Sequence, residues 1–264
     1  MPQIISFISQ KGGSGKTTCC ANVAAALGKR GRSVLVLDID PQRSLETYLR
    51  PLDAPDATVS ILHQGENRIR GPIDPANTIK EIAQLKDDPK LFDLDYILID
   101  APPSLDNEAL SAAMVSDMVV VPCGASSLDI GATASTLDVI RQVRAKRRGQ
   151  YPILAVQPTR IQSGTSTAKV IESELAQLFS EEEKNSLTLG WGFVLPPIGL
   201  RNIFSQSWDW QQTVMDCEPA SSKAVLEIER TTDRIERTFV SGEKYHHLEG
   251  RTLAAAAGSE PSDG

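Results

Sequence analysis

Short, almost uninterrupted runs of Val, Ile and Leu recur along this 264-residue chain. An unbroken apolar run of this kind is typical of a strand that is covered on both faces of its sheet. Five runs predict buried strands: Ile4–Ile8, Ser33–Asp40, Asp95–Asp100, Asp117–Cys123 and Pro152–Pro158. A shorter run, Trp191–Pro196, is a candidate sixth strand.

Helix-like stretches separate these runs: Lys16–Arg30, Asn107–Met114, Leu128–Arg148 and Thr165–Ser180. The alternating order predicts an α/β fold, a doubly wound and mostly parallel sheet flanked by helices. In such sheets ligands bind at the carboxyl ends of the strands.

Two regions interrupt the alternation. Residues 51–90 are rich in Pro, Asp and Asn, and we expect a variable loop-and-helix insertion there. The stretch 241–264 has little to bury and is expected to be a disordered tail. Residues 1–240 are then expected to form a single domain.

Composition excludes several classes of protein. No apolar run approaches the roughly 20 residues that span a bilayer. The first residues show no basic segment or cleavage site of an export signal, so we expect a cytoplasmic protein. The four cysteines lack metal-ligand spacing. The net charge of -7 argues against a generally basic surface but permits a local basic patch.

The stretch "SQKGGSGKTT" follows the first predicted strand and opens the first predicted helix, as a phosphate-binding loop does. The usual pattern G-x-x-x-x-G-K-[ST] would require a glycine where this chain has Gln10. Lys16 is placed to reach the β- and γ-phosphates, and the Thr17 hydroxyl to ligate Mg²⁺. The expected nucleotide-binding residues are Lys11, Gly12, Gly13, Ser14, Gly15, Lys16, Thr17 and Thr18.

Two other strands end in carboxylates. Asp100 closes an apolar strand, and Asp38 and Asp40 lie two residues apart, on one face of an extended chain. Each could instead cap the end of its strand. Together at one edge of a sheet they favour a magnesium site beside the phosphate loop.

The segments "KGGSGKTT", "DIDPQ" and "DYILIDAPPS" together resemble the ParA/MinD family of deviant Walker P-loop ATPases, over about Ile4 to Val240. The resemblance implies a slow, partner-stimulated ATPase that uses ATP and Mg²⁺. It implies that Lys11 reaches across an ATP-dependent homodimer to the partner's phosphates and that Asp40 positions the attacking water. It assigns Asp38 and Asp100, with Thr17, to the magnesium shell. In isolation, Lys11 would be read as a solvated loop lysine.

Within the family, the chain resembles the short ParA partition ATPases most. It lacks the cluster cysteines of iron–sulfur relatives, and its end lacks the basic amphipathic helix of a MinD relative, so no membrane binding is expected. The resemblance implies non-specific binding to nucleoid DNA and a centromere-binding or cargo adaptor protein. A MinD-like positioning ATPase and a dimer switch with little hydrolysis are the alternatives. The sequence does not identify the cargo.

Two contact surfaces are predicted less directly. The segment "RQVRAKRRGQ" offers a DNA-binding surface of Arg141, Arg144, Lys146, Arg147 and Arg148. Its alternative is a solvated helix end, where cations favour the helix dipole. The resemblance places adenine contacts near Gln157, Pro158 and Pro197. The family's small residues after Arg201 are replaced here by Phe204, Trp208 and Trp210, which predict either an aromatic packing cluster or a partner surface.

Overall fold

The structure, a computed structural model, describes residues 1–48, 59–63, 84, 93–147, 152–180 and 192–256. Within these ranges seven strands form one sheet in the order β3-β2-β4-β1-β5-β6-β7, and every neighbouring pair is parallel. The strands are β1 (Gln3–Phe7), β2 (Val34–Asp38), β3 (Val59–His63), β4 (Tyr96–Asp100), β5 (Met118–Cys123), β6 (Ile153–Pro158) and β7 (Gly192–Val194).

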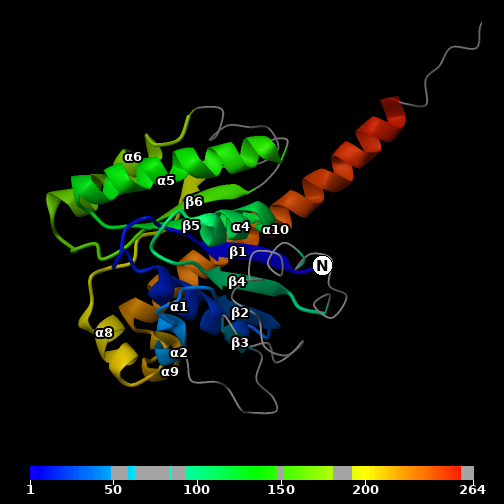
Figure 1. Cartoon of the computed structure of the whole chain (residues 1–264). Coiled ribbons are helices and arrows are strands. Elements are labelled where there is room, and N and C mark those ends of the chain that lie inside the picture. The colour runs from blue at the N-terminus through cyan, green and yellow to red at the C-terminus, as the bar shows by residue number, and fades with distance from the viewer. Residues whose placement is uncertain (49–58, 64–83, 85–92, 148–151, 181–191, 257–264) are drawn as a thin grey trace, which may run out of the picture.

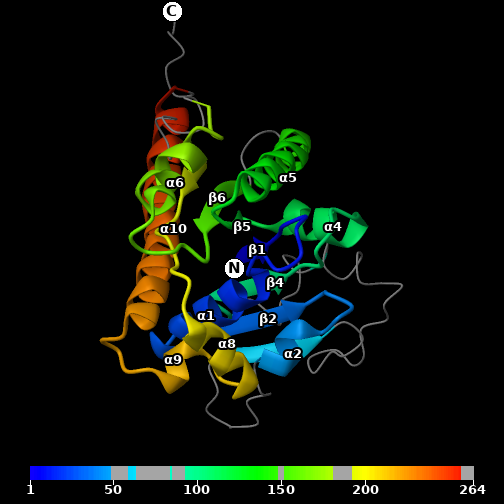
Figure 2. The ribbon, with the colours of Figure 1, turned by 90° about the vertical axis from the view of Figure 1, so that its left-hand side faces the viewer.

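Helices cover both faces of the sheet. They are α1 (Lys16–Lys29), α2 (Ser44–Tyr48), α4 (Asn107–Val115), α5 (Ser127–Lys146), α6 (Ser166–Ala176), α8 (Asn202–Asp209), α9 (Val214–Cys217) and α10 (Lys223–Ala256). One buried cluster joins α1, α9 and α10 to the sheet, and a second joins α4, α5 and α6 to the opposite face. Figures 1 and 2 show α10 on one side of the strands and α4 and α5 on the other. The predicted doubly wound parallel sheet is confirmed.

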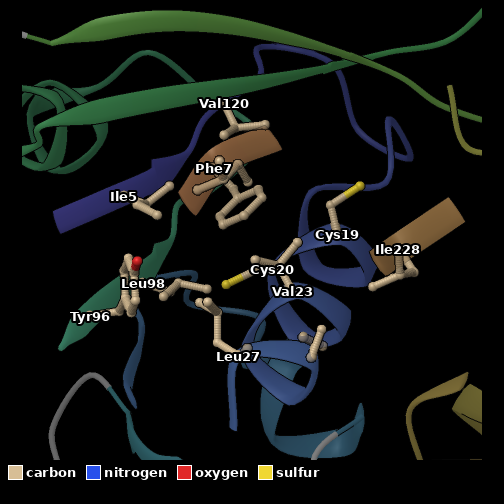
Figure 3. Close-up of a cluster of buried hydrophobic side chains, with 14 of the residues drawn as sticks. Ile5, Phe7, Cys19, Cys20, Val23, Leu27, Tyr96, Leu98, Val120 and Ile228 are labelled. Atoms are coloured by element: carbon tan, nitrogen blue, oxygen red, sulfur yellow. The ribbon is translucent and has the colours of Figure 1, made fainter. Parts of the chain in front are cut away.

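The first core cluster explains why α1 lies so close to the sheet. Its sequence, KTTCCANVAAALGK, places small side chains between helix and strands, so the backbone can approach. Cys19 and Cys20 are buried against this face, and Phe7 and Leu98 extend toward them from β1 and β4 (Figure 3). Both cysteines thus pack α1 onto the sheet, and both are free thiols.

Two parts of the chain differ from the sequence expectation. Within residues 51–90 the structure has a strand, β3, which pairs with β2 at the edge of the sheet. The rest of that segment, apart from residue 84, lies outside the described ranges. The helix α10 runs to Ala256, so residues 241–256 are helical rather than disordered. The four consecutive alanines at 254–257 and the lack of proline before Pro261 favour this continuation. Trp191, the predicted start of the sixth strand, lies outside the described residues.

No helix in the described ranges combines the length and hydropathy needed to cross a membrane.

A buried polar side chain connects three helices near the carboxyl edge of the sheet. Asn22 of α1 donates to the Thr18 carbonyl (2.8 Å) and to the Tyr48 hydroxyl of α2 (2.9 Å). Its amide oxygen accepts from the Val214 backbone N–H of α9 (2.9 Å). Because Asn22 is fully buried, water does not reach these groups to replace the hydrogen bonds that Asn22 makes.

We therefore expect Asn22→Ala to lower the free energy of unfolding by about 2–3 kcal/mol, because it removes the hydrogen-bond partner of the buried Val214 N–H and one of the two partners of the Tyr48 hydroxyl. Denaturant unfolding followed by circular dichroism measures this. Asn202→Ala, at an exposed asparagine at the start of α8, is the matched control and should change stability by less than about 0.5 kcal/mol. Equal effects of the two substitutions would contradict a stabilising role for the Asn22 network.

Candidate functional site

The loop between β1 and α1 forms one end of a cavity at the carboxyl edge of the sheet. The cavity has a volume of about 570 Å³ and extends from this loop to α8. The loop and the start of α1 contribute Gly12, Gly13, Gly15, Lys16, Thr17, Thr18 and Cys19. The other lining residues are Asp40, Gln42, Ser44, Pro103, Thr159, Arg160, Ile198, Gly199, Leu200, Arg201, Phe204, Ser205, Trp208, Asp209 and Ile228.

Glycine is required in this loop by its backbone conformation. Gly13 (φ 71°) and Gly15 (φ 96°) both adopt left-handed angles that side chains disfavour. The Thr159 hydroxyl, from the end of β6, donates to the Ser14 carbonyl (2.8 Å) and fixes the loop from outside. The loop thus enters α1 with the first amides of the helix unpaired at its N-terminus, an arrangement that binds phosphate groups.

A buried charged cluster lies beneath the loop. The Thr17 hydroxyl donates to Asp100 Oδ2 (2.7 Å) at the end of β4. Burial, followed by the nearby Asp38 carboxylate, raises the pKa of Asp100 to about 8. Burial lowers the pKa of Lys16, although Asp100 and Asp40 act in the opposite direction. Burial therefore disfavours both the Asp100 carboxylate and the Lys16 ammonium in the empty site. A bound cation would favour the first, and a bound phosphate the second.

Two oxygens in this cluster fit a bound cation and phosphate. Among the described residues, Ser14 Oγ and Asp100 Oδ1 are the buried side-chain polar atoms without a hydrogen-bond partner. No three His, Cys, Asp or Glu side chains in the described ranges gather as a self-sufficient metal site. Mg²⁺ characteristically takes one or two protein oxygens and completes its shell with phosphates and water. Thr17 and Asp100 fit such an ion.

The two carboxylates after β2 have different surroundings. Asp38 is fully buried, and its oxygens accept from the backbone N–H groups of Asp40 (3.0 Å) and Leu45 (3.0 Å). It therefore shapes the turn into α2, and its place in a magnesium shell stays a prediction. Asp40 lines the cavity, and its Oδ1 accepts from the Gln42 backbone N–H (2.9 Å). This bond fixes the carboxylate at the cavity surface.

Lys11 has a partner that the sequence did not reveal. Its ammonium forms an ion pair with Asp129, in the first turn of α5. Burial opposes ionisation of Asp129, but hydrogen bonds from Lys11 and Ser126 outweigh it and lower the pKa of the carboxyl. The S-x-x-D pattern at Ser126 was readable as a capping box at a helix start. The contact of Asp129 with a lysine 118 residues away could not be read from the sequence.

Gly124 makes room for this ion pair. A Cβ at that position would lie 2.5 Å from an Asp129 carboxylate oxygen and 3.2 Å from an Arg160 guanidinium nitrogen. Arg160 lines the cavity and has a left-handed backbone (φ 56°), which is unusual for a residue other than glycine. The backbone N–H groups of its neighbours Thr159 and Ile161 are bonded to Cys123 and Ile198, which hold this strained residue at the cavity.

The predicted adenine contacts do not line the cavity. Gln157 is fully buried: it donates to the Pro196 carbonyl (2.6 Å) and accepts from the Thr231 hydroxyl (3.2 Å). It therefore links β6 to the segment after β7 and to α10, behind the cavity. Pro158 and Pro197 are likewise absent from the lining, which takes the next residues in each segment, such as Thr159 and Ile198. A contact of the three predicted residues with adenine stays a prediction.

The predicted basic surface on α5 is partly used inside the fold. Arg144 is buried and donates to the Pro152 carbonyl (2.7 Å), and Arg147 donates to the Ser116 carbonyl. Arg141 binds Asp138 (2.6 Å) and the Leu178 carbonyl (2.6 Å). Lys146 is exposed, and Arg148 lies outside the described residues. These arginines fasten α5 to neighbouring segments, and their DNA contact stays a prediction.

Comparisons with known proteins agree with this geometry. Residues 5–196 match the family of CobQ/CobB/MinD/ParA nucleotide binding domains. The chromosome-partitioning ATPase Soj of Thermus thermophilus is 31% identical over 194 residues, which cover 67% of this chain and 77% of that protein.

Two solved structures show a similar fold. The septum site-determining protein MinD of Pyrococcus horikoshii, complexed with Mg-ADP, aligns with a TM-score of 0.66 at 23% identity and covers 89% of this chain and 96% of its own. Apo McdA of Cyanothece aligns with a TM-score of 0.66 at 15% identity, and the alignment covers 89% of this chain and 99% of the McdA chain. At these identities the likeness concerns the fold alone, and it agrees with the predicted α/β fold with a parallel sheet flanked by helices.

The raised pKa of Asp100 predicts a pH-dependent stability of the empty protein. Folding favours the protonated carboxyl, so its stabilisation is complete below the ordinary pKa of 3.8 and is lost as the pH rises through about 8. The Asp100→Asn side chain has no proton to lose. The stability of this variant should therefore fall less than that of the wild type between about pH 5 and about pH 8. Thermal unfolding without Mg²⁺ or nucleotide measures this difference.

Asp93→Asn, at an exposed aspartate, is the control and should follow the wild-type pH profile. Parallel profiles for Asp100→Asn and wild type would show that the Asp100 carboxyl does not hold a proton in the empty site.

Proposed function

Because the chain belongs to the CobQ/CobB/MinD/ParA family of nucleotide-binding domains, we propose that it is a ParA-like ATPase that forms an ATP-sandwich homodimer. In this proposal the dimer binds DNA without sequence preference and segregates or positions a cargo. An adaptor protein stimulates its slow hydrolysis. The observation that carries the proposal is Lys11, a second lysine in the phosphate loop, which lies outside the lining of its own cavity.

The residues at the loop end of the cavity would bind and orient the triphosphate. The amides of Gly12 to Thr18 and the Lys16 ammonium neutralise its charge, and phosphoryl transfer depends largely on such positioning. Bound Mg²⁺, held by Thr17 and Asp100, would supply further charge neutralisation. Asp40, fixed at the cavity surface by the Gln42 N–H, would hold the attacking water.

Lys11 supports the dimer because, within its own chain, it pairs with the Asp129 carboxylate and does not line the cavity that would hold the phosphates. Its side chain is 39% exposed at the rim of the site, so a partner's nucleotide could reach it. In the dimer its ammonium would exchange Asp129 for the partner's phosphates, which carry more negative charge. A cation supplied in trans in this way acts on transferring phosphoryl groups as an arginine finger does.

Two exposed basic side chains are candidates for the DNA-binding surface. The net charge of -7 requires that any DNA-binding surface be local. Lys146 on α5 is exposed, and Arg237 on α10 belongs to a second set of cations interleaved with acidic residues. Partition and positioning proteins among the relatives include Soj of Thermus thermophilus and the carboxysome-distribution protein of Halothiobacillus neapolitanus, which is 32% identical over 142 residues.

Measurements of nucleotide binding and of dimerisation should distinguish the roles of Lys11 and Lys16. Lys16→Ala removes a charge-assisted phosphate contact in its own site and should weaken binding of a non-hydrolysable ATP analogue by about 10- to 100-fold. Lys11→Ala should bind the analogue nearly as wild type does but remain a monomer. Calorimetry measures the binding, and light scattering coupled to size exclusion measures the mass.

Asp129→Asn is the matched control for Lys11→Ala, because it breaks the same ion pair and keeps the lysine. It should dimerise with the analogue at least as well as wild type. Dimerisation of Lys11→Ala at wild-type concentrations would refute the role in trans.

The ATP-bound protein should bind unrelated DNA sequences with similar affinity, and that affinity should fall steeply with salt because counterions are released from the phosphates. Fluorescence anisotropy with labelled duplexes at several salt concentrations measures this. Lys146→Glu should weaken binding if α5 carries the surface, and Arg237→Glu if α10 does. Absence of binding at low salt, with ATP and a confirmed dimer present, would exclude the DNA-binding part of the proposal and leave the ATPase part intact.

A further inference from the structure

Two aromatic side chains of α8 form one side of the cavity. Phe204 and Trp208 are four residues apart, so they lie on the same face of the helix, and both line the cavity. We call this pair the aromatic wall. Trp210, two residues further along, does not line the cavity and is 52% exposed. One tryptophan therefore borders the cavity and the other faces solvent.

The aromatic wall is supported from behind by α2. The ring of Trp208 stacks on that of Tyr48, with centroids 5.0 Å apart and an angle of 22° between the planes. Tyr48 is fully buried; its hydroxyl accepts from Asn22 (2.9 Å) and shares a hydrogen bond with Ser207 (3.0 Å). Trp208 is thus held in place in the empty protein, and a ligand that contacts it incurs little ordering entropy.

The lining of the cavity offers an apolar region for a nucleoside. Phosphates bound by Gly12 to Thr18 occupy the loop end of the cavity. The base and ribose then extend toward the remaining walls, which are apolar over Ile198, Leu200, Phe204, Trp208 and Ile228. A base presents a flat π-face, and stacking on an aromatic side chain strengthens binding of a nucleotide.

We propose that Trp208, backed by Tyr48, stacks against the base of the bound nucleotide and makes the site prefer purine over pyrimidine nucleotides. The larger face of a purine covers more of the indole ring, so the preference follows from contact area. Trp208 is a specificity-determining residue in this proposal and takes no part in phosphoryl transfer. The inference rests on the proposed nucleotide site, but it does not depend on dimerisation or DNA binding.

Affinities for three ligands test the proposal: ADP, CDP and inorganic pyrophosphate, each with Mg²⁺, by calorimetry on the full chain. None carries a γ-phosphate, so the proposed dimer does not contribute. Trp208→Leu keeps an apolar side chain and removes the ring. It should weaken ADP binding by about tenfold, leave pyrophosphate binding within about twofold, and reduce the ratio of ADP to CDP affinity.

Trp208→Phe keeps a smaller ring and should give an intermediate ADP to CDP ratio. Trp210→Leu is the matched control and should bind all three ligands as wild type does. If Trp208→Leu lowers the melting temperature of the empty protein too far for calorimetry, the Trp208→Phe ratio alone decides: a wild-type ratio in that variant overturns the proposal.

Equal ADP affinity in Trp208→Leu and wild type, or parallel losses for ADP, CDP and pyrophosphate, would overturn the role of Trp208. Both results would leave the proposed ATPase site intact, because wild type would still bind ADP and pyrophosphate. Failure of wild type to bind either ligand would instead overturn the nucleotide site itself, and the inference with it.

Discussion

A carboxylate buried at the end of β4 governs the organisation of this site. Asp100 lies beside Lys16 and Thr17, away from water, and one of its oxygens has no partner among the described residues. Burying a charge without full compensation is unfavourable, so the surrounding structure has to fix it tightly. Parallel pairing of β4 with β1 provides that, because it brings the end of β4 level with the start of the phosphate loop. The empty site is therefore arranged around a carboxyl whose pKa is raised to about 8 by burial, and a bound cation would favour its ionised form.

Much of this arrangement could be predicted from the sequence because its signals are local. Unbroken apolar runs predicted six of the strands, and the helix-like stretches between them predicted α1, α4, α5 and α6. The loop around Lys16 and the strand-end Asp40 and Asp100 are motifs whose context, strand before and helix or turn after, lies within a few residues. The parallel sheet then brings the motifs together without further information, since all strands end at one edge.

The rest depends on contacts between distant residues. Asp129 pairs with Lys11 across 118 residues, and Thr159 binds Ser14 across 145. Single-sequence patterns do not report such pairs. Gln157 shows the same limit: its adenine contact stays a prediction, and the hydrogen bonds of its side chain to Pro158, Pro196 and Thr231 could not be read from the sequence. The short strand β3 was missed because it lies in a segment rich in Pro, Asp and Asn. The helical continuation of α10 was missed because the prediction weighed the lack of apolar residues to bury above the helix propensity of the alanines.

The position of α10 has a consequence for synthesis of the chain. Ile228 of this helix lines the cavity, Glu227 binds both the Gly199 N–H and Arg201, and Thr231 holds Gln157. The phosphate loop, by contrast, precedes α10 in the chain and is translated before it. A nascent chain thus contains its phosphate-binding loop before the other half of the cavity exists. Nucleotide can be enclosed only after α10 has left the ribosome and docked, so a helix far downstream completes the site that the loop begins.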